Sequence, residues 1–565
     1  MDFKQELISL LRTITQLKEE EVSNLLSTPP DHKLGDYAFP CFKLGKNPRE
    51  EAEKLKEKFT KSTLPNFIGK IEVAGPYLNF FLNQSILAAA VLKKIYQEQK
   101  FYGKQKIKAQ RIVVEYCGPN TNKPLHLGHL RNISLGNSLV RILSFQGHKV
   151  SPVNIVNDRG IHICQSMLAY QKWGQNKEPD KKGDHFVGDY YVLFAKQVKD
   201  NPELKEEARE LLVKWEQGDK GTLALWKKMN KWVLDGFEET YQRFGIKFDK
   251  DYFESAYYDL AKEMVQEGLK TKKFKQDDTG AVIAPLEKYN LPDKVLLRRD
   301  DTSIYITQDL YLSALRYRDF KFDQMIYVVA SEQRLHFQQL FKILELMGKK
   351  YASNMHHLSY GLVHLPSGRM KSREGNVVDA DDIMDEVAEL ARKEIESRHS
   401  NILESEIKSR AENIALSAIK FFMLKTDPVK DIVFNPEESM SFEGETGPYV
   451  QYTHARACSI LRKSGLKILV NINYPEFNSA EELNLIKLLA QFKEVIEQSA
   501  VNQKPHHLAQ YLISLSQAFN EFYHKLPVIS EDKDLMKARL LLVDSVRQVL
   551  ANGLNLLGIT ALEEM

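Results

Sequence analysis

Cysteine is scarce in this sequence, and neither sign of charge is in clear surplus. The 565 residues include only four cysteines, far apart and without a CxxC pair. That pattern indicates neither a disulfide framework nor a zinc knuckle, and it favours a reducing compartment. The formal net charge is only +3. The net charge therefore does not indicate a nucleic-acid-binding protein, although a local basic face could still bind a polyanion.

Long hydrophobic runs are also missing. The most apolar stretch, near residues 85–92, is far shorter than the ~20 residues that a membrane-spanning helix needs. The opening segment mixes acidic residues into its apolar positions, unlike a secretory signal or an Arg-rich transit peptide. We therefore expect a cytoplasmic protein with no membrane partner.

What the sequence does contain is ordinary globular material, with 43% hydrophobic and 27% charged residues. At ~100–200 residues per domain, the length predicts about three to five domains. Residues 1–108 combine an amphipathic helix, a middle punctuated by Gly and Pro, a strand-like stretch at 71–82 and a lysine-rich linker. This mixture predicts an N-terminal α+β domain.

The second region, residues 109–380, has the rhythm of a Rossmann-like α/β domain. A β-branched run from Arg111 to Cys117 predicts a buried strand, and a helical pattern and another strand-like run follow. Strand, helix, strand is typical of a doubly wound parallel sheet. Residues 173–290 are rich in charge and aromatic side chains and predict an insertion. Further strand-like runs are predicted at 303–307, 325–330 and 359–363.

The remaining residues show helical periodicity. Residues 381–441 predict a helical connector, and residues 442–565 predict an all-α domain with helices near 449–461, 480–498 and 535–556. No internal repeat or low-complexity tract interrupts them.

The strongest chemical signal is Pro119-Asn-Thr-Asn-Lys-Pro-Leu-His-Leu-Gly-His-Leu-Arg-Asn132, between the first strand and the first helix of the second region. His126 and His129 are three residues apart, so on a helical turn they share a face. Gly128 lies between them, where a missing Cβ lets a flat ring approach the backbone. Free N–H groups at a helix start favour phosphate, and Lys123 and the imidazoles add donors and charge. The segment could therefore stabilise the negative charge that builds on the phosphate during attack at the α-phosphorus of ATP.

Two plainer interpretations compete for the pair of histidines. They could be structural, which is the better interpretation of a bare HxxH, or they could ligate zinc. Cys117 is the only nearby cysteine, no third histidine completes a set, and no HExxH glutamate is present. The joint presence of strand, Asn-Lys-Pro, the histidine motif and helix favours the nucleotide.

The stretch His126-Leu-Gly-His129 resembles the His-Ile-Gly-His motif of class I aminoacyl-tRNA synthetases, and Asn120 through His129 with Arg131 resembles the arginine enzyme most. The resemblance implies a Rossmann-like catalytic domain with an α+β N-terminal domain and an all-α C-terminal anticodon-binding domain. It also implies that His126, His129 and Lys123 act in catalysis and that Leu127 and Gly128 contact ATP.

A second family motif, Lys-Met-Ser-Lys-Ser, is resembled by the segment from Gly368 to Gly375. Its glycines permit movement and its cations could clamp a triphosphate, whereas a charged surface turn is the plain alternative. Ser372 stands where the motif has its second lysine. In arginine enzymes a lysine before the histidine motif is thought to compensate, and Lys123 is so placed. The resemblance implies four residues for this loop, two catalytic (Lys371, Arg373) and two contacting ATP (Met370, Ser372), and the division of labour among the cations stays open.

Recognition of a guanidinium needs carboxylates and amide oxygens, because its planar fork of donors is always charged. By resemblance, the arginine-binding positions are Glu115, Asn120, Tyr305, Asp309 and Gln333. Each has a plain alternative: Glu115 could be an edge-strand charge, and Asp309 could lie in the acidic first turn of a helix. Further ATP-site candidates are His336, Leu362 and Val363.

The last region contains Tyr449, Tyr452 and Arg456 on one predicted helical face. Tyrosine rings and an arginine guanidinium are flat groups that can stack on unpaired bases. The plain alternative is that these residues belong to the hydrophobic core, as aromatic residues at this helical spacing more often do. The segment resembles the start of the family's anticodon-binding domain. By the same resemblance Met565 lies near the anticodon, and Tyr77 and Asn79 of the N-terminal region contact the tRNA elbow.

The implied reaction has two steps and no protein nucleophile. The carboxylate of L-arginine attacks ATP, which arrives as its Mg²⁺ substrate complex, and tRNA(Arg) then takes the arginyl group. We expect a monomer without a tightly bound metal or organic cofactor. Family analogy also implies that the first step requires tRNA. The alternatives are a synthetase for another amino acid, a catalytically inactive paralogue acting as a tRNA-binding module, and a smaller nucleotidyltransferase.

Overall fold

The computed structural model describes residues 3–29, 32–61, 64–105, 107–258, 260–300, 302–366, 378–398, 402–472, 477 and 479–565. The chain divides into two compact units. The first consists of Met1–Tyr102, Arg456–Phe492 and Leu515–Val549, and the second consists of Gly103–Ala455, Lys493–Ser514 and Leu550–Met565. The predicted last region therefore contributes to both units.

The N-terminal part of the first unit is an α+β fold. Its antiparallel sheet has the order β1-β3-β2, formed by β1 (Tyr37–Pro40), β2 (Ile68–Ala74) and β3 (Tyr77–Leu82). The predicted strand at 71–82 is thus a hairpin, which turns at Gly75 with a φ of +59°. The helices of this part are α1 (Phe3–Thr15), α2 (Glu19–Leu25), α3 (Pro48–Lys61) and α4 (Gln84–Glu98).

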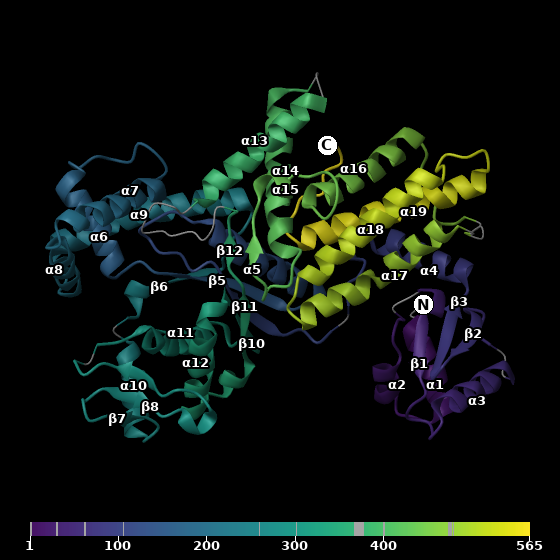
Figure 1. The fold of residues 1–565 in the computed structure, drawn as a ribbon, viewed down its shortest axis with the longest axis horizontal. Helices are drawn as coiled ribbons and strands as arrows, with labels where there is room; N and C mark the ends of the chain where they lie inside the picture. Colours follow the sequence, from purple (N-terminus) through teal and green to yellow (C-terminus); the bar gives the residue numbers. More distant parts are fainter. Residues whose placement is uncertain are drawn as a thin grey trace. The chain divides into compact units, whose positions relative to one another are not determined.

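The second unit is built on a five-stranded parallel sheet of order β11-β10-β4-β5-β6 (Figure 1). The strands are β4 (Arg111–Glu115), β5 (Lys149–Val156), β6 (Lys250–Phe253), β10 (Gln324–Ala330) and β11 (Met355–Tyr360). The strand order reverses between β4 and β10, and ligands of such sheets bind outside the carboxyl ends at this switch point. The predicted doubly wound sheet is confirmed.

The predicted insertion at 173–290 needs a correction, because β6 lies inside this interval and pairs with β5 in the sheet. The chain therefore leaves the sheet twice, once between β5 and β6 and once after β6, and the predicted interval covers parts of both excursions. The first is a group of helices between β5 and β6 (Figure 1). It comprises α6 (Ile161–Trp173), α7 (Gly183–Asp200), α8 (Leu204–Glu216) and α9 (Lys220–Phe244). The second comprises α10 (Ala261–Lys270) and a small antiparallel sheet of β7 (Lys275–Gln276), β8 (Val282–Ala284) and β9 (Lys294–Leu297). Sequence pattern missed β6 because a strand of four residues gives almost no periodicity.

The strand predicted at 303–307 is wrong. Helix α11 (Tyr305–Phe320) begins there, with Ile304 at its N-cap. A short run rich in β-branched residues cannot be told from a helix start by periodicity. The Thr307 hydroxyl donates to the Leu296 carbonyl and accepts from the Ile304 N–H, so it anchors the first turn.

Other elements complete the described chain. They are α5 (Leu127–Gln146), α12 (Arg334–Leu346), β12 (Val363–His364), α13 (Ala380–Arg398), α14 (Glu404–Leu424), β13 (Ile432–Val433), α15 (Pro436–Ser439), α16 (Gly447–Ser464), α17 (Ala480–Val501), α18 (His506–Lys525) and α19 (Lys533–Leu556). The predicted helices at 449–461, 480–498 and 535–556 lie within α16, α17 and α19. Within the described ranges, none of the helices has the length and apolarity of a membrane crossing.

Candidate active site

The histidine motif forms the start of α5, with His126 at the N-cap. The Gly128 N–H donates to Nδ1 of His126 at 3.1 Å, and the His126 N–H donates to Nδ1 of His129 at 3.1 Å. The two imidazole rings lie 3.9 Å apart by their centroids. A Cβ at position 128 would lie 3.0 Å from the His126 ring, so glycine is what lets this ring fold over the helix start.

Both imidazoles are neutral donors. Burial lowers the pKa of His126 to about 3, with the charge of Lys123 adding to the effect. Burial, His126 and Lys123 lower the pKa of His129 well below its usual value. Because each Nδ1 accepts a backbone hydrogen bond, the proton of each neutral ring is on Nε2. The histidines therefore present Nε2–H groups, and the positive charge comes from Lys123.

The expectation of free N–H groups at this helix start is wrong. The Leu127 N–H donates to the Val378 carbonyl at 3.3 Å, the Gly128 N–H donates to its neighbouring imidazole, and the His129 N–H donates to the His126 carbonyl at 2.7 Å. A phosphate at this turn would meet side-chain donors rather than unsatisfied backbone amides.

The next turn of α5 ties strand ends together. Arg131 is fully buried, and its guanidinium donates to four carbonyls, those of Gly361 (2.7 Å), Leu362 (3.0 Å), Pro428 (3.1 Å) and Lys430 (2.6 Å). The candidate ATP residue Leu362 is therefore fixed to the histidine helix, and Val363 follows it in β12, where it pairs with Ile432 of β13.

Asn132 binds the ends of three strands. Its Oδ1 accepts from the Cys117 N–H just beyond β4, and its Nδ2 donates to the Val328 carbonyl of β10 at 2.8 Å and to the Tyr360 hydroxyl of β11 at 3.0 Å. Cys117 has a φ of +82°, a conformation that a side chain other than glycine rarely adopts. Strain of this kind gathers where a fold holds a functional turn.

Two predicted ligands of different substrates contact each other. His336 on α12 lies 2.6 Å from a carboxylate oxygen of Asp309 on α11, measured from its Nε2. Tyr305 begins α11 and is 76% exposed, and Gln333 is exposed just before α12. The structure thus brings Asp309 and His336 together and leaves Tyr305 and Gln333 open to a ligand.

Glu115 has a buried partner. Its carboxylate forms an ion pair with Arg316 of α11, and both side chains are almost fully buried. Because β4 lies between β5 and β10, the edge-strand interpretation of Glu115 is wrong. Asn120 is exposed and its backbone pairs with Asn157 after β5. Sequence reasoning gave no sign of Arg316, since α11 reaches Glu115 only through the sheet order.

Glu254 is a candidate that the sequence analysis missed. It directly follows β6, is only 7% exposed, and lies near Arg159, Asp158 and Asp309. Burial raises its pKa, while Arg159 and a hydrogen bond from Gln308 act in the opposite direction. The signal that could have found it is an acid at the carboxyl end of a sheet strand, but that signal needed β6 to be recognised.

Arg159, which follows β5, is held by two aromatic rings and two carboxylates. Its guanidinium lies 3.9 Å from the Tyr258 ring centre and 5.2 Å from that of Trp215. It also pairs with Glu216 at 2.6 Å and with Glu254 at 3.9 Å. Asp158 is engaged by the hydroxyl and N–H of Ser255. The acids here outnumber their nearest cation, which suits a cationic ligand.

One cluster among the described residues could supply ligands to a metal ion, namely Asp184, His185 and Asp381. The ammonium of Lys182 already lies 3.0 Å from Asp184 and 2.6 Å from Asp381. An internal cation thus neutralises two of the three groups.

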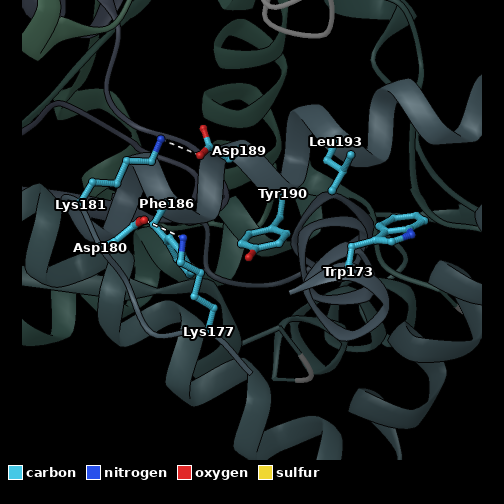
Figure 2. Close-up of a pocket in the computed structure, with 8 residues that line it drawn as sticks. All are labelled: Trp173, Lys177, Asp180, Lys181, Phe186, Asp189, Tyr190 and Leu193. Carbon is cyan, nitrogen blue, oxygen red and sulfur yellow. Dashed lines mark hydrogen bonds and ion pairs between the residues drawn. The ribbon is translucent and has the colours of Figure 1, made fainter. Parts of the chain in front are cut away.

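A cavity of about 540 Å³ lies between α6 and α7, apart from the histidine motif. None of the predicted site residues lines it. Figure 2 shows two exposed ion pairs along its wall, Lys177 with Asp180 and Lys181 with Asp189, each at 2.6 Å.

The second motif lies outside the described residues, and with it Met370, Lys371, Ser372 and Arg373. The candidate tRNA residues are described. Tyr449 and Tyr452 are half-buried on α16, and the Tyr452 ring meets Phe442 edge-on.

Arg456, on the same helix, donates to Oδ1 of Asn520 at 2.5 Å. Met565 is half-exposed. In the N-terminal part, Tyr77 is 37% exposed whereas Asn79 is only 3% exposed. An RNA contact by Asn79 would therefore require it to move.

Comparison with known proteins gives three family matches that together cover most of the chain. Residues 91–436 match the family described as tRNA synthetases class I (R), catalytic domain. Residues 450–565 match the DALR anticodon binding domain, and residues 1–82 match the arginyl tRNA synthetase N terminal domain.

Full-length relatives agree. The chain is 44% identical over 570 residues to the arginine–tRNA ligase of Treponema denticola, covering 98% of this chain and 96% of the relative. It is 42% identical over 579 residues to that of Treponema pallidum, covering 99% and 98%. Among solved structures, Thermus thermophilus arginyl-tRNA synthetase aligns over 99% of both chains with a TM-score of 0.84 and 29% identity.

Proposed function

The chain belongs to the class I arginyl-tRNA synthetases and has arginine–tRNA ligase activity, and on that premise we propose how its residues divide the work. ATP and arginine are its substrates, and its anticodon-binding domain binds tRNA. The observations that carry the assignment of roles are a neutral histidine turn after β4 and a group of buried acids after β5 and β6 of the same sheet.

The histidine turn binds the phosphates of ATP. The Nε2–H groups of His126 and His129 are fixed donors, because their Nδ1 atoms are held by the backbone. Lys123 supplies positive charge beside them. Donors and charge fixed in advance stabilise the negative charge that develops during attack at the α-phosphorus. From the sequence, Lys371, Arg373, Met370 and Ser372 complete the phosphate contacts, and ATP enters with Mg²⁺ as its substrate complex.

Leu127, Gly128, His336, Leu362 and Val363 form the rest of the proposed ATP site. Arg131 supports this part, because its bonds to the carbonyls of residues 361 and 362 fix the loop beside the histidine helix. The protein then positions and neutralises charge, and no side chain of it becomes covalently bound.

The guanidinium of arginine binds between Asp309 and Glu254. Asp309 lies near the start of α11, and Glu254 directly follows β6, where it is buried and shares Arg159 with Glu216. Tyr305, Gln333 and Asn120 are exposed and can supply neutral acceptors. Glu115 remains a proposed contact, with Arg316 competing for its carboxylate.

The proposed tRNA contacts are Tyr449, Tyr452, Arg456 and Met565 for the anticodon side, and Tyr77 and Asn79 for the elbow. Partly exposed aromatic rings on α16 support stacking on unpaired bases. The tRNA is tRNA(Arg), the first step requires it, and the enzyme is a cytoplasmic monomer. Sedimentation and ATP–pyrophosphate exchange with and without tRNA test these last points.

The assignment is tested with arginine and citrulline, which has nearly the same shape without the charge. With tRNA and ATP present, arginine should support exchange and charging. Citrulline should be at least about 1000-fold poorer, since buried carboxylates would lose their cation. Comparable activity with citrulline would overturn the proposed pocket. Absence of charging with arginine would favour the alternative of an inactive paralogue that binds tRNA.

A further inference from the structure

A group of charged side chains lies where α7, α9 and α13 meet, next to the histidine turn. We call Lys182, Asp184, His185, Asp379 and Asp381 the lysine cluster. The Lys182 ammonium contacts Asp381 at 2.6 Å, Asp184 at 3.0 Å and the Thr240 hydroxyl at 2.5 Å. His185 contacts Asp381 at 3.0 Å through Nε2 and Asp379 at 3.5 Å through Nδ1.

The lysine cluster is well enclosed. Asp184 has no exposed surface, and its carboxylate packs on Gly236 of α9, where a Cβ would come within 2.4 Å of Oδ1. Lys182 and Asp381 are each less than one-fifth exposed. Removing one partner from such a group leaves a charge without compensation, so the cluster strongly favours one arrangement.

This arrangement fixes the short segment that leads into α13. The backbones of Asp379 and His126 pair as an antiparallel bridge. The Ala380 N–H donates to the Leu125 carbonyl at 2.9 Å, and the Leu127 N–H donates to the Val378 carbonyl at 3.3 Å. The residues before and after Asp379 therefore hold the residues before and after His126.

The same helix also supports the turn from its other side. Gly188 of α7 lies against Pro124, where a Cβ would come within 2.9 Å of Cδ. Helix α7 thus touches the histidine turn directly through Gly188 and indirectly through Asp379 and Asp381. Two attachments from one helix fix the turn in both position and orientation.

We propose that Lys182, His185 and Asp381 are positioning residues of the ATP site, which hold segment 378–380 against the histidine turn. This rests on the proposed ATP-binding role of that turn. With Val378 engaging the Leu127 N–H, the turn keeps the conformation in which both imidazoles present Nε2–H groups. Loss of the lysine cluster loosens the segment and misplaces the donors.

Charge gives this arrangement a pH dependence. The hydrogen bond to Asp381 raises the pKa of His185 above its usual value, with Asp184 and Asp379 adding to the effect and burial opposing it. The groups that face it are Lys182 and Asp184 from its own helix and Asp379 and Asp381 from the start of α13. As pH rises through this raised pKa, His185 loses its charge and holds the aspartates less tightly. The KM for ATP should therefore increase.

The test compares Asp381→Asn and Lys182→Met with Asp189→Asn, a matched control that removes an exposed ion pair on the same helix (Figure 2). Exchange kinetics with tRNA present should show kcat/KM for ATP lowered about ten- to a hundredfold in the first two variants. The control should match wild type. His185→Gln should lose the rise in KM with pH while remaining active at low pH.

A readout independent of activity is hydrogen exchange of the Leu127 and Ala380 amides. Asp381→Asn should speed their exchange at least about tenfold, while amides of the β10 core and the thermal unfolding midpoint change little. Unchanged protection of both amides, or equal loss in Asp189→Asn, would overturn the proposal. Global acceleration of exchange would show general destabilisation and also overturn it. Failure of the wild-type protein to activate arginine would contradict the proposed function. The hydrogen-exchange comparison would still test the role of the lysine cluster.

Discussion

The two halves of the active site are built in opposite ways. The histidine turn, which supplies the fixed donors of the nucleotide half, lies in one continuous stretch from Lys123 to Arg131 and folds into a helix start and its first turns. The amino-acid half is assembled from residues far apart in the chain, such as Asp158, Glu254 and Asp309, which meet because of the strand order. A continuous turn carries its chemistry in its own sequence, whereas an assembled pocket depends on the sheet.

The two halves also differ in charge. Around the histidine turn, burial and Lys123 lower the pKa values of both imidazoles. Around the acids, burial raises the pKa values of Asp158 and Glu254. The nucleotide half is thus suited to an anion such as ATP, and the amino-acid half is suited to a cation such as arginine. Substitutions in each half should therefore affect one substrate and spare the other.

The largest expected effect is in the nucleotide half. His126→Ala or His129→Ala should lower kcat for arginine activation about 100- to 1000-fold, because each removes a fixed donor to developing charge. Steady-state pyrophosphate exchange with tRNA present measures it, and the KM for arginine should change little. His524→Ala, an exposed histidine, is the control. Activity within about twofold of wild type in either motif variant would place ATP elsewhere.

Next comes Asp309→Asn in the amino-acid half. Losing a charged partner of a guanidinium should lower kcat/KM for arginine about 100-fold. The KM for ATP should stay the same, because the asparagine amide can still hydrogen-bond His336, which lies 2.6 Å from this side chain. A matching rise in the KM for ATP would show that the two halves are not separable at this position. In that case Asp309 would act mainly through His336.

These two cases show what sequence can and cannot predict. The histidine turn was readable because spacing, strand and helix all lie within about 30 residues of a βαβ unit. The tautomers of the two imidazole rings could not be predicted, because they depend on which backbone N–H groups donate to the rings. The sequence also did not predict that the first N–H groups of α5 already have acceptors, because Val378 reaches Leu127 through a pairing of segments some 250 residues apart.

The amino-acid half shows the same limit more strongly. Asp309 was found by resemblance, but its contact with His336 and the burial of Glu115 against Arg316 follow from helix packing on the sheet. Glu254 was missed altogether because β6 is too short to reveal itself. The overall doubly wound fold was predictable because its strands are strongly β-branched, as in Ile112–Val114 of β4.

A sharper test of the assembled pocket is Glu254→Gln. If this buried carboxylate binds the guanidinium, kcat/KM for arginine should fall about tenfold, in keeping with loss of one charge-assisted contact. Glu216→Gln is the matched control, because Glu216 also pairs with Arg159 but is much more exposed. An equal loss in both variants would assign the effect to Arg159 and remove Glu254 from the pocket.

The smallest expected effect concerns Asp379, an acid whose backbone pairs with His126 of the histidine turn. Burial raises the pKa of Asp379 to about 6 from an ordinary 3.8, with Asp382, Asp184 and Asp381 adding to it and His185 opposing it. At pH 7 the folded protein therefore carries this charge at a cost that the unfolded chain does not have. The full shift corresponds to ~3 kcal/mol. Because the side chain is 25% exposed, solvent screening leaves about 1 kcal/mol.

Asp379→Asn should accordingly raise the free energy of unfolding at pH 7 by about 1 kcal/mol. The sign follows from protonation: below pH 3.8 the carboxyl is neutral in both states, so the gain should shrink as pH falls from 6 to 4. Urea unfolding of both proteins at pH 7, 6, 5 and 4 measures the difference. A gain that persists unchanged at pH 4 would come from packing rather than charge. A loss at pH 7 would mean that the attraction between Asp379 and His185 outweighs the cost of burying the Asp379 carboxylate.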